Sequence, residues 1–301
     1  ISVLSLLLGT AITVILSGNI VRPVNALSTA MQRVANGDYD VKLETKSNFE
    51  IIRRVYSDFN HMVDELNAVE TLRNDFVSNV SHEFKTPLSS IEGYAMLLQD
   101  ESLSAEARSE YTERIVVSTR RLSTLVSNIL MITKIENQTM PFTLSSYRVD
   151  EQVRQSILLL ENKWSEKNIG FEMDMDSIEF CAVEGLLGNV WSNLIDNAIK
   201  FSPEGEIIYI SLKEKDDMLS FKIANRGEPM SDETLKRIFE KFYQGDTSHK
   251  REGNGLGLAL VKKIVRVHGG SVSAVNTEDG LIEFTVNLPA KRSCERCCGS
   301  N

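Results

Sequence analysis

The sequence of 301 residues is poor in cysteine and has no excess of basic residues. It contains only four cysteines, three of them in the terminal CERCC stretch, so we expect no disulfide-stapled scaffold. Those three lack the histidine or further cysteine pair that would complete a four-ligand metal site, and we predict a disordered, reduced tail at 291–301. The 33 basic and 42 acidic residues give a net charge of −9, which argues against nucleic acid as a partner because such a protein needs a basic face.

The first 21 residues lack charge altogether, and this run is long enough to cross the hydrocarbon core of a bilayer as a helix. A signal peptide would show a basic region before the apolar run and a small-residue cleavage site after it, and neither is present. Arg22 and Arg33 follow the run, whereas no basic residue precedes it. We therefore predict a transmembrane helix at 1–21 in the plasma membrane, with the chain from about residue 22 onward in the cytoplasm. The absence of an initiator methionine indicates that the chain starts inside a longer protein.

Two amphipathic stripes follow this segment. The first runs through Val24, Leu27, Met31 and Val34, and the second through Ile52, Val55, Phe59, Met62 and Leu66. The second stripe has the 3.5-residue period of a coiled coil. Short helices with such seams cannot bury their apolar faces alone, so we predict a parallel helical bundle in a dimer. The stretch at 22–69, in which Pro23 opens one helix and Glu50 the other, resembles the HAMP signal-relay module, and an ordinary coiled-coil stalk is the alternative.

A helical hairpin is predicted at 70–138. Apolar residues recur at steps of three and four from Phe76 to Leu98 and again from Tyr111 to Ile132, and polar turn residues separate the two runs. Two helices of about 30 residues each would form an antiparallel hairpin, and two such hairpins form a four-helix bundle. We therefore expect this domain to make the chain a homodimer.

The first helix of this hairpin carries the stretch SHEFKTPL at 81–88. His82 lies off the apolar seam, so we expect its side chain to be exposed, with Glu83 next to it in the chain and Thr86 one turn further on. Pro87 cannot donate a hydrogen bond to the carbonyl of Glu83, and we expect the helix to be loosened there and free to bend. A bend beside an exposed imidazole would let a second domain approach it.

Residues 143–290 change to a mixed pattern. Helices are expected near 149–164, 184–200 and 256–268. Alternating runs predict strands at Ile169–Met175, Ile207–Leu212, Leu219–Ala224, Ser271–Val275 and Ile282–Leu288. Together these elements predict an α+β sandwich, in which one mixed sheet carries helices on a face.

The helix expected at 184–200 lies within the first of four motifs, NVWSNLIDNAIKFS. Asn193 and Asn197 lie one turn apart on a common side, outside the apolar stripe, and Lys200 follows. An amide oxygen can bind Mg²⁺ as a neutral ligand, and a lysine one turn further on can meet phosphate oxygens. Taken alone, the two asparagines would be ordinary amides on a helix surface.

Three further motifs follow in order. They are ANRGEPM with Asn225 and Gly227, RIFEKFYQGD with Phe239 and Phe242, and GNGLGLAL with Gly253, Gly255, Leu256 and Gly257. The first ends a strand at a glycine-containing turn, and the aromatic spacing of the second would hold a loop to the core at both ends. The glycines of the third let backbone amides approach a phosphate at the positive end of a helix. That motif lacks the Lys-Ser/Thr of a P-loop. It also lacks the strand–turn–helix position and the downstream acidic residue of a dinucleotide-binding fold, and by itself it is a weak signal.

These motifs, in this order behind a hairpin that bears SHEFKTPL, resemble those of bacterial two-component sensor histidine kinases. The resemblance covers essentially all of residues 22–290, with the family's H, N, G1, F and G2 boxes at 81–88, 193–202, 225–230, 239–243 and 253–258. It implies a Bergerat-type ATP-binding domain at 143–290 and a dimerisation and histidine phosphotransfer domain at 70–138. It also implies ATP and Mg²⁺ as cofactors, and the receiver domain of a cognate response regulator as partner.

The resemblance implies a role for each matching residue. His82 would attack the γ-phosphorus of ATP, Glu83 would take the proton from the other ring nitrogen, and Thr86 would position water for dephosphorylation of the regulator. Asn197 would hold Mg²⁺, assisted by Asn193. The other residues implied at the nucleotide are Lys200, Asn225, Gly227, Phe239, Phe242, Gly253, Gly255, Leu256 and Gly257.

The sequence departs from the family at Asn225, where an aspartate usually accepts a hydrogen bond from the adenine amino group. A neutral bond in place of a charge-assisted one is expected to cost about 1 kcal/mol, and we therefore predict weakened ATP binding. Two alternatives stay open. One is a member with little kinase activity that works as a response-regulator phosphatase or signalling scaffold. The other is a Bergerat ATPase of the chaperone or DNA-repair kind, which would leave the membrane span and the exposed histidine unexplained.

Overall fold

The computed structural model describes the whole chain except residues 1, 45–48, 138–142, 246–253 and 291–301. The predicted tail and Gly253 therefore lie outside the described residues. The chain divides into two units, Ile1–His82 and Glu83–Asn301. The helix α3 (Glu50–Leu97) runs through the division, so that His82 and Glu83 are consecutive residues of one helix.

The first unit is helical on both sides of an extended connector. Its elements are α1 (Ser2–Leu16), the π-helical η1 (Ser17–Val21), α2 (Arg22–Ala35) and the first part of α3. Ala30 of α2, Val41 of the connector, and Phe59 and Val63 of α3 form its small core. The hydroxyl of Tyr56 donates to the carbonyl oxygen of Pro23 at 2.9 Å, and so ties α3 to the start of α2.

A side-chain amide fixes the connector. The backbone N–H of Leu43 donates to Oδ1 of Asn60, and Nδ2 of Asn60 donates to the carbonyl oxygen of Leu43, both at 2.9 Å. An ion pair between Lys42 and Asp64 adds to this contact. The two predicted stripes and their extended link thus pack together as expected for a signal-relay module.

One described helix, α4 (Ala105–Glu136), is long and apolar enough to span a membrane by length and composition alone, and the apolar helical stretch Ser2–Ala11 is shorter. In α4 the side chains of Leu125, Ile132 and Ile135 are buried in the protein core, whereas those of Val117, Val126 and Leu130 are exposed. The helix predicted at 1–21 instead consists of α1 and η1 and continues directly into α2.

The long helix α3 carries both the second apolar stripe of the relay module and the first apolar run of the hairpin, and it continues unbroken for 48 residues. Val69 and Leu72, which lie between the two runs, are exposed at 62% and 70%. Pro87 lies inside α3 without ending it.

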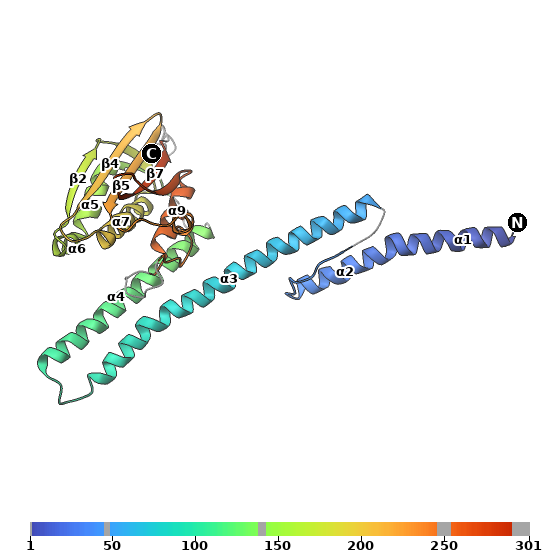
Figure 1. Ribbon diagram of the computed structural model, residues 1–301, viewed down its shortest axis with the longest axis horizontal. Coiled ribbons are helices and arrows are strands. Elements are labelled where there is room, and N and C mark those ends of the chain that lie inside the picture. Colours follow the sequence, from blue (N-terminus) through green and yellow to red (C-terminus); the bar gives the residue numbers. More distant parts are fainter. Residues whose placement is uncertain (1, 45–48, 138–142, 246–253, 291–301) are drawn as a thin grey trace, which may run out of the picture. The chain divides into compact units, whose positions relative to one another are not determined.

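The hairpin prediction is confirmed in the second unit, where α4 returns antiparallel to the end of α3 (Figure 1). Ser104 caps α4, since its hydroxyl accepts the N–H of Ala107 at 3.1 Å. Near the turn, the rings of Tyr94 and Tyr111 lie 5.5 Å apart between centroids.

The rest of the second unit is the predicted α+β sandwich. Its strands are β1 (Ser145–Arg148), β2 (Gly170–Met175), β3 (Glu179–Ala182), β4 (Ile207–Lys215), β5 (Met218–Arg226), β6 (Ser271–Asn276) and β7 (Leu281–Pro289). Its helices are α5 (Val149–Leu158), α6 (Glu161–Glu166), α7 (Glu184–Phe201), α8 (Asp232–Arg237) and α9 (Gly257–Val267).

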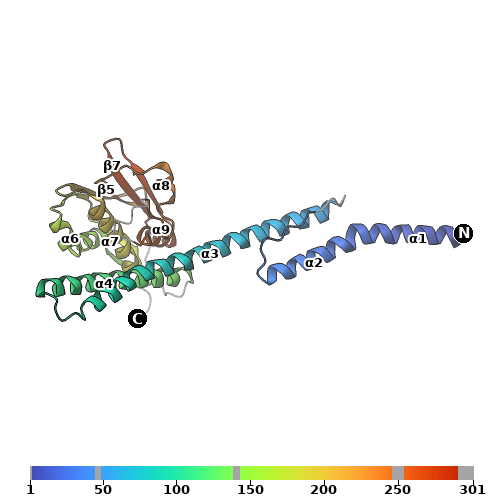
Figure 2. The same ribbon diagram turned by 60° about the horizontal axis from the view of Figure 1, so that its bottom comes forward.

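Five of the strands form one mixed sheet in the order β2-β4-β5-β7-β6, and β1 pairs with β3 separately. Only the β2–β4 pair in the five-stranded sheet is parallel. Figures 1 and 2 show α7 and α9 on the same face of the sheet. The largest fully buried side chains, among them Trp191, Phe221 and Phe284, fill the space between these helices and the strands.

Candidate nucleotide site and phosphoacceptor helix

The helix α7 presents the first predicted motif. Its buried stripe consists of Leu186, Leu187, Val190, Trp191, Leu194, Ile195, Ala198 and Ile199. Asn193, Asn197 and Lys200 lie beside the stripe and are half-buried. The side-chain Nδ2 of Asn193 donates to the carbonyl oxygen of Asn189 at 2.7 Å, which fixes how the amide is turned.

The amide oxygen of Asn193 lies against the start of α9. A Cβ built on Gly257 would sit only 2.6 Å from Oδ1 of Asn193, closer than real Cβ atoms approach other atoms. Two motifs that are more than 60 residues apart in the sequence therefore meet, and this meeting requires glycine at position 257.

The phenylalanine motif joins them through Gly255. The backbone N–H of Phe242 donates to the carbonyl oxygen of Gly255 at 2.9 Å. A Cβ on Gly255 would lie 2.7 Å from Cα of Phe242, and both residues have positive φ, 63° for Gly255 and 62° for Phe242. Only glycine adopts this conformation without strain and also lets another backbone come so close.

Two residues predicted at the nucleotide lie in the hydrophobic core. Leu256 is fully buried, and its backbone N–H donates to Oδ1 of Asn254 at 3.3 Å. Phe239 packs edge-on against Phe284, with ring centroids 6.3 Å apart. The side chains of Leu256 and Phe239 thus hold the motif to the core, as the aromatic spacing predicted for Phe239.

The strand-end motif reaches the other end of α7. Asn225 is buried, and its Nδ2 donates to the carbonyl oxygen of Arg226 at 3.1 Å. A Cβ on Gly227 would lie 3.1 Å from Cδ1 of Ile282 and 3.6 Å from the carbonyl oxygen of Phe201. The turn therefore passes close to the last residue of the helix that carries Asn193 and Asn197.

The donor set fits a nucleotide phosphate with Mg²⁺. Gly255 and Gly257 let the backbone at the positive N-terminal end of α9 pack closely against Phe242 and Asn193, and such a helix end suits an anion. Among the described residues, no group of three or more His, Cys, Asp or Glu side chains is arranged to hold a metal ion. A neutral amide oxygen, such as that of Asn197, is a type of ligand that Mg²⁺ accepts in proteins.

The side chain of His82 is exposed on α3, as predicted, and so is that of Thr86. The neighbouring Glu83 is mostly buried, and its Oε2 lies 3.6 Å from Nη2 of Arg121 on α4. That oxygen has no hydrogen-bond partner among the described residues. Glu83 therefore has an acceptor oxygen that is not used by another hydrogen bond in the described part of the chain, and it lies next to His82 in the sequence.

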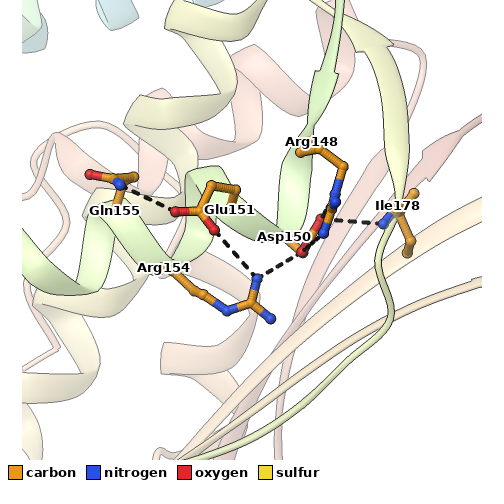
Figure 3. Close-up of polar contacts among 6 residues, drawn as sticks. All are labelled: Arg148, Asp150, Glu151, Arg154, Gln155 and Ile178. Atoms are coloured by element: carbon orange, nitrogen blue, oxygen red, sulfur yellow. Dashed lines mark hydrogen bonds and ion pairs between the residues drawn. The ribbon is translucent and has the colours of Figure 1, made fainter.

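Sequence reasoning missed a buried ion cluster at the start of the sandwich (Figure 3). The carboxylate of Asp150 accepts two hydrogen bonds from Arg148, at 2.8 and 2.7 Å, and one from Arg154 at 2.7 Å. The N–H of Ile178 donates to it at 3.3 Å. These donors, Arg148 foremost, hold the pKa of Asp150 far below its usual range despite burial. The cluster joins β1, α5 and the turn before β3, away from the predicted motifs.

Comparison with protein families agrees with this organisation. Three family models match in order: the HAMP domain at residues 15–68, the His Kinase A (phospho-acceptor) domain at 72–138, and the Histidine kinase-, DNA gyrase B-, and HSP90-like ATPase at 182–292. The fold and the paired motifs thus define an ATPase domain joined to a phosphoacceptor hairpin. The chain belongs to the two-component sensor histidine kinases.

Individual relatives support the same family. The chain is 33% identical over 288 residues to the heme sensor protein HssS of Staphylococcus aureus (strain JH9), covering 95% of this chain and 62% of HssS. The chain thus spans less than two thirds of the length of that relative. Full-length ShkA, solved in complex with AMPPNP, is 28% identical with a TM-score of 0.54, over 73% of this chain and 46% of ShkA. The histidine kinase ThkA, solved with the response regulator protein TrrA, shares the fold at 23% identity and a TM-score of 0.60, over 75% of this chain and 64% of that chain.

Proposed function

We propose that this chain is the kinase portion of a membrane sensor, which transfers the γ-phosphoryl group of Mg-ATP to His82 and then to an aspartate of a response-regulator receiver domain. The observation that carries the proposal is the approach of Gly257 to Asn193, because it brings the N and G2 motifs together at the N-terminal end of α9. The complex of the related ShkA with AMPPNP, an ATP analogue, supports ATP as the ligand.

In this proposal each part of the site has one task. Asn197 and Asn193 would hold Mg²⁺, which when bound would offset negative charge on the triphosphate. Lys200 meets phosphate oxygens, and the backbone amides at Gly255 and Gly257 add the partial positive charge of the α9 N-terminus.

At the acceptor, a ring nitrogen of His82 forms the new bond to the γ-phosphorus while the bond from that phosphorus to the leaving ADP oxygen breaks. The attacking nitrogen must carry no proton, so the neutral form of the imidazole is the nucleophile. The proton on the other ring nitrogen passes to the carboxylate of Glu83, whose buried Oε2 lacks a hydrogen-bond partner among the described residues.

The same proposal covers location and assembly. Large apolar side chains of α1, such as Val3 and Leu4, are exposed at 72% and 74%, which suits contact with lipid. We assign 1–21 to the plasma membrane and the remainder to the cytoplasm, as the arginines that follow the segment predict. Two chains form the dimer through the α3–α4 hairpin, which by itself supplies only half of a four-helix bundle.

Asn225 favours a second candidate function for the chain. In the structure the Nδ2 of this buried amide is already committed to the carbonyl oxygen of Arg226, so its oxygen is the atom left to face an adenine amino group. If ATP binding is too weak for kinase activity, the chain acts instead as a response-regulator phosphatase or scaffold. In that case Thr86 is needed to position water and His82 is dispensable.

The test is autophosphorylation of the 301-residue chain in detergent micelles with Mg-ATP labelled at the γ-phosphate. We expect label that is acid-labile and base-stable, that disappears in His82→Gln, and that persists in His61→Gln, a matched variant at another exposed histidine of α3. Label that survives in His82→Gln would refute the assignment of the phosphoacceptor. Absence of label in the unmodified chain, together with measurable nucleotide binding, would favour the phosphatase or scaffold.

A further inference from the structure

Lys167 lies in the turn between α6 and β2 and reaches across to the end of α7. Its Nζ donates three hydrogen bonds to backbone carbonyl oxygens, to Ile199 at 3.0 Å, Lys200 at 2.8 Å and Ser202 at 3.0 Å. Its own carbonyl oxygen accepts the N–H of Gly205 at 2.9 Å. An ammonium group has three N–H donors, and all three are used on this one helix end.

The end of a helix needs such a partner. The last carbonyl groups of an α-helix have no intrahelical donor, and the helix dipole places partial negative charge there. In α7 the carbonyl of Ala198 is met by the hydroxyl and the N–H of Ser202, at 2.7 and 3.0 Å. Lys167 satisfies the carbonyls of residues 199, 200 and 202, so one side chain closes the last turn of α7.

That last turn carries Lys200, the cation that the proposed function places at the phosphates. The carbonyl group of Lys200 accepts the shortest of the three bonds from Lys167, so the backbone from which the Lys200 side chain extends is held directly. The Nζ of Lys200 lies 4.7 Å from the ring centroid of Phe201, which limits where the ammonium can point.

We infer that Lys167 is a positioning residue for ATP binding, which acts through Lys200 by fixing the last turn of α7. The inference rests on the proposed function, because it assumes that Lys200 meets phosphate. Lys167 itself bonds only backbone groups in the described contacts and is not assigned to the nucleotide.

The chain offers a matched control four residues earlier. Lys163 on α6 also reaches α7, but its Nζ pairs with the carboxylate of Asp196 at 2.5 Å, and both side chains are well exposed, at 59% and 41%. An exposed pair of this kind contributes little to stability. Lys163→Met therefore removes a lysine that links the same two helices without touching the carbonyl groups at the end of α7.

The experiment is isothermal titration of the 301-residue chain in detergent micelles with Mg-ATP, which yields both Kd and the number of sites per chain. We expect Lys167→Met to raise Kd about five- to ten-fold with the number of sites unchanged, because a small displacement of a charged group weakens its contact strongly. Lys163→Met should change Kd less than about two-fold. In a Lys200→Met background, adding Lys167→Met should change Kd less than about two-fold, since both act on one contact.

Several results would overturn the inference. One is an unchanged Kd with fewer binding sites in Lys167→Met, the sign of a merely structural role. Another is an equal rise in Lys163→Met, and a third is a full additional effect in the Lys200→Met background. If the unmodified chain binds no Mg-ATP at all, the proposed function fails first and the inference fails with it.

Discussion

The contact between Gly257 and Asn193 can be tested by adding one methyl group. In Gly257→Ala the new Cβ would start 2.6 Å from Oδ1 of Asn193, whereas ordinary contacts begin at 3.4 Å. One of the two groups must therefore move by about 0.8 Å, the difference between these distances. Either the amide of Asn193 rotates away, or the first turn of α9 shifts off the helix α7.

The two responses differ in their cost to stability. Rotation of Asn193 breaks its 2.7 Å bond to the carbonyl oxygen of Asn189, which costs about 1 kcal/mol. A shift of α9 disturbs the buried side chains of Leu256, Leu260 and Val261, and overpacking of that kind costs about 1–3 kcal/mol. The amide is therefore expected to rotate. Replacing glycine by alanine at the start of a helix returns up to about 1 kcal/mol, so the net change in unfolding free energy should be close to zero.

Nucleotide binding should respond much more strongly than stability. Rotation takes the Asn193 oxygen from its place beside the proposed phosphate site, and we expect the Kd for Mg-ATP to rise about ten-fold or more. Kd is measured by calorimetric titration and unfolding free energy by urea denaturation of the same samples. The matched control is Gly185→Ala on α7, where a Cβ meets nothing within 4 Å and binding should stay unchanged.

Wild-type affinity in Gly257→Ala would refute this reasoning, because it would mean that the position of Asn193 does not affect the nucleotide. A loss of stability of several kcal/mol would refute the other half, the expectation that the amide yields before the helix does. A drop in affinity in Gly185→Ala would show that any glycine substitution near α7 weakens binding, and the contact with Asn193 would then explain nothing.

Two further changes give sharp expectations. Asp150→Asn should destabilise the sandwich by about 2–3 kcal/mol at pH 7 in urea denaturation, a figure already reduced for the partial exposure of Arg148 and Arg154. Because the native pKa of Asp150 is lowered, its contribution to the unfolding free energy is fully present above the unfolded pKa of about 3.9 and is lost as the pH falls below that value. The difference in unfolding free energy between the unmodified chain and Asp150→Asn should therefore shrink in acid, and a constant difference would contradict the ion cluster. Asn225→Asp removes the donor to the Arg226 carbonyl and buries a charge, so we expect a loss of about 1–3 kcal/mol in stability. The carboxylate should also bind Mg-ATP several-fold more tightly. An unchanged Kd by calorimetry would show that position 225 does not face the adenine.

Much of the fold could be predicted because apolar periodicity reports burial directly. All five strands of the main sheet were expected within one to three residues of their ends, as were α7 and α9. The four-residue strands β1 and β3 and the six-residue helix α8 were missed, since such short elements hold too few residues to show a period. The helix expected near 149–164 is interrupted between α5 and α6, where Leu159 is 81% exposed.

Some residues of the candidate site could be predicted from the sequence and others could not. Motif spacing predicted Asn193, Gly255 and Gly257, and the structure brings Gly257 against Asn193, because glycines and amides in a fixed order leave a trace in the sequence. Lys167 left none, since its partners are backbone carbonyl groups more than 30 residues away and any residue type supplies a carbonyl. Asp150 was missed for a related reason: nothing in the local sequence distinguishes a buried carboxylate from the many exposed ones.

The contacts of α7 explain why its side chains, rather than the helix, should yield to a perturbation. At its start, the N–H of Val183 donates to Nε2 of His268 at 3.3 Å, and Nδ1 of the same ring lies 2.9 Å from the carbonyl oxygen of Ile264, so the end of α9 is bonded to the start of α7. In its first half, the indole N–H of Trp191 donates to the side chain of Gln152 at 2.9 Å. With its far end closed by Lys167, α7 is held at three places along its length. A rigid helix places its asparagine and lysine side chains before the ligand arrives, and this lowers the entropy that binding must overcome.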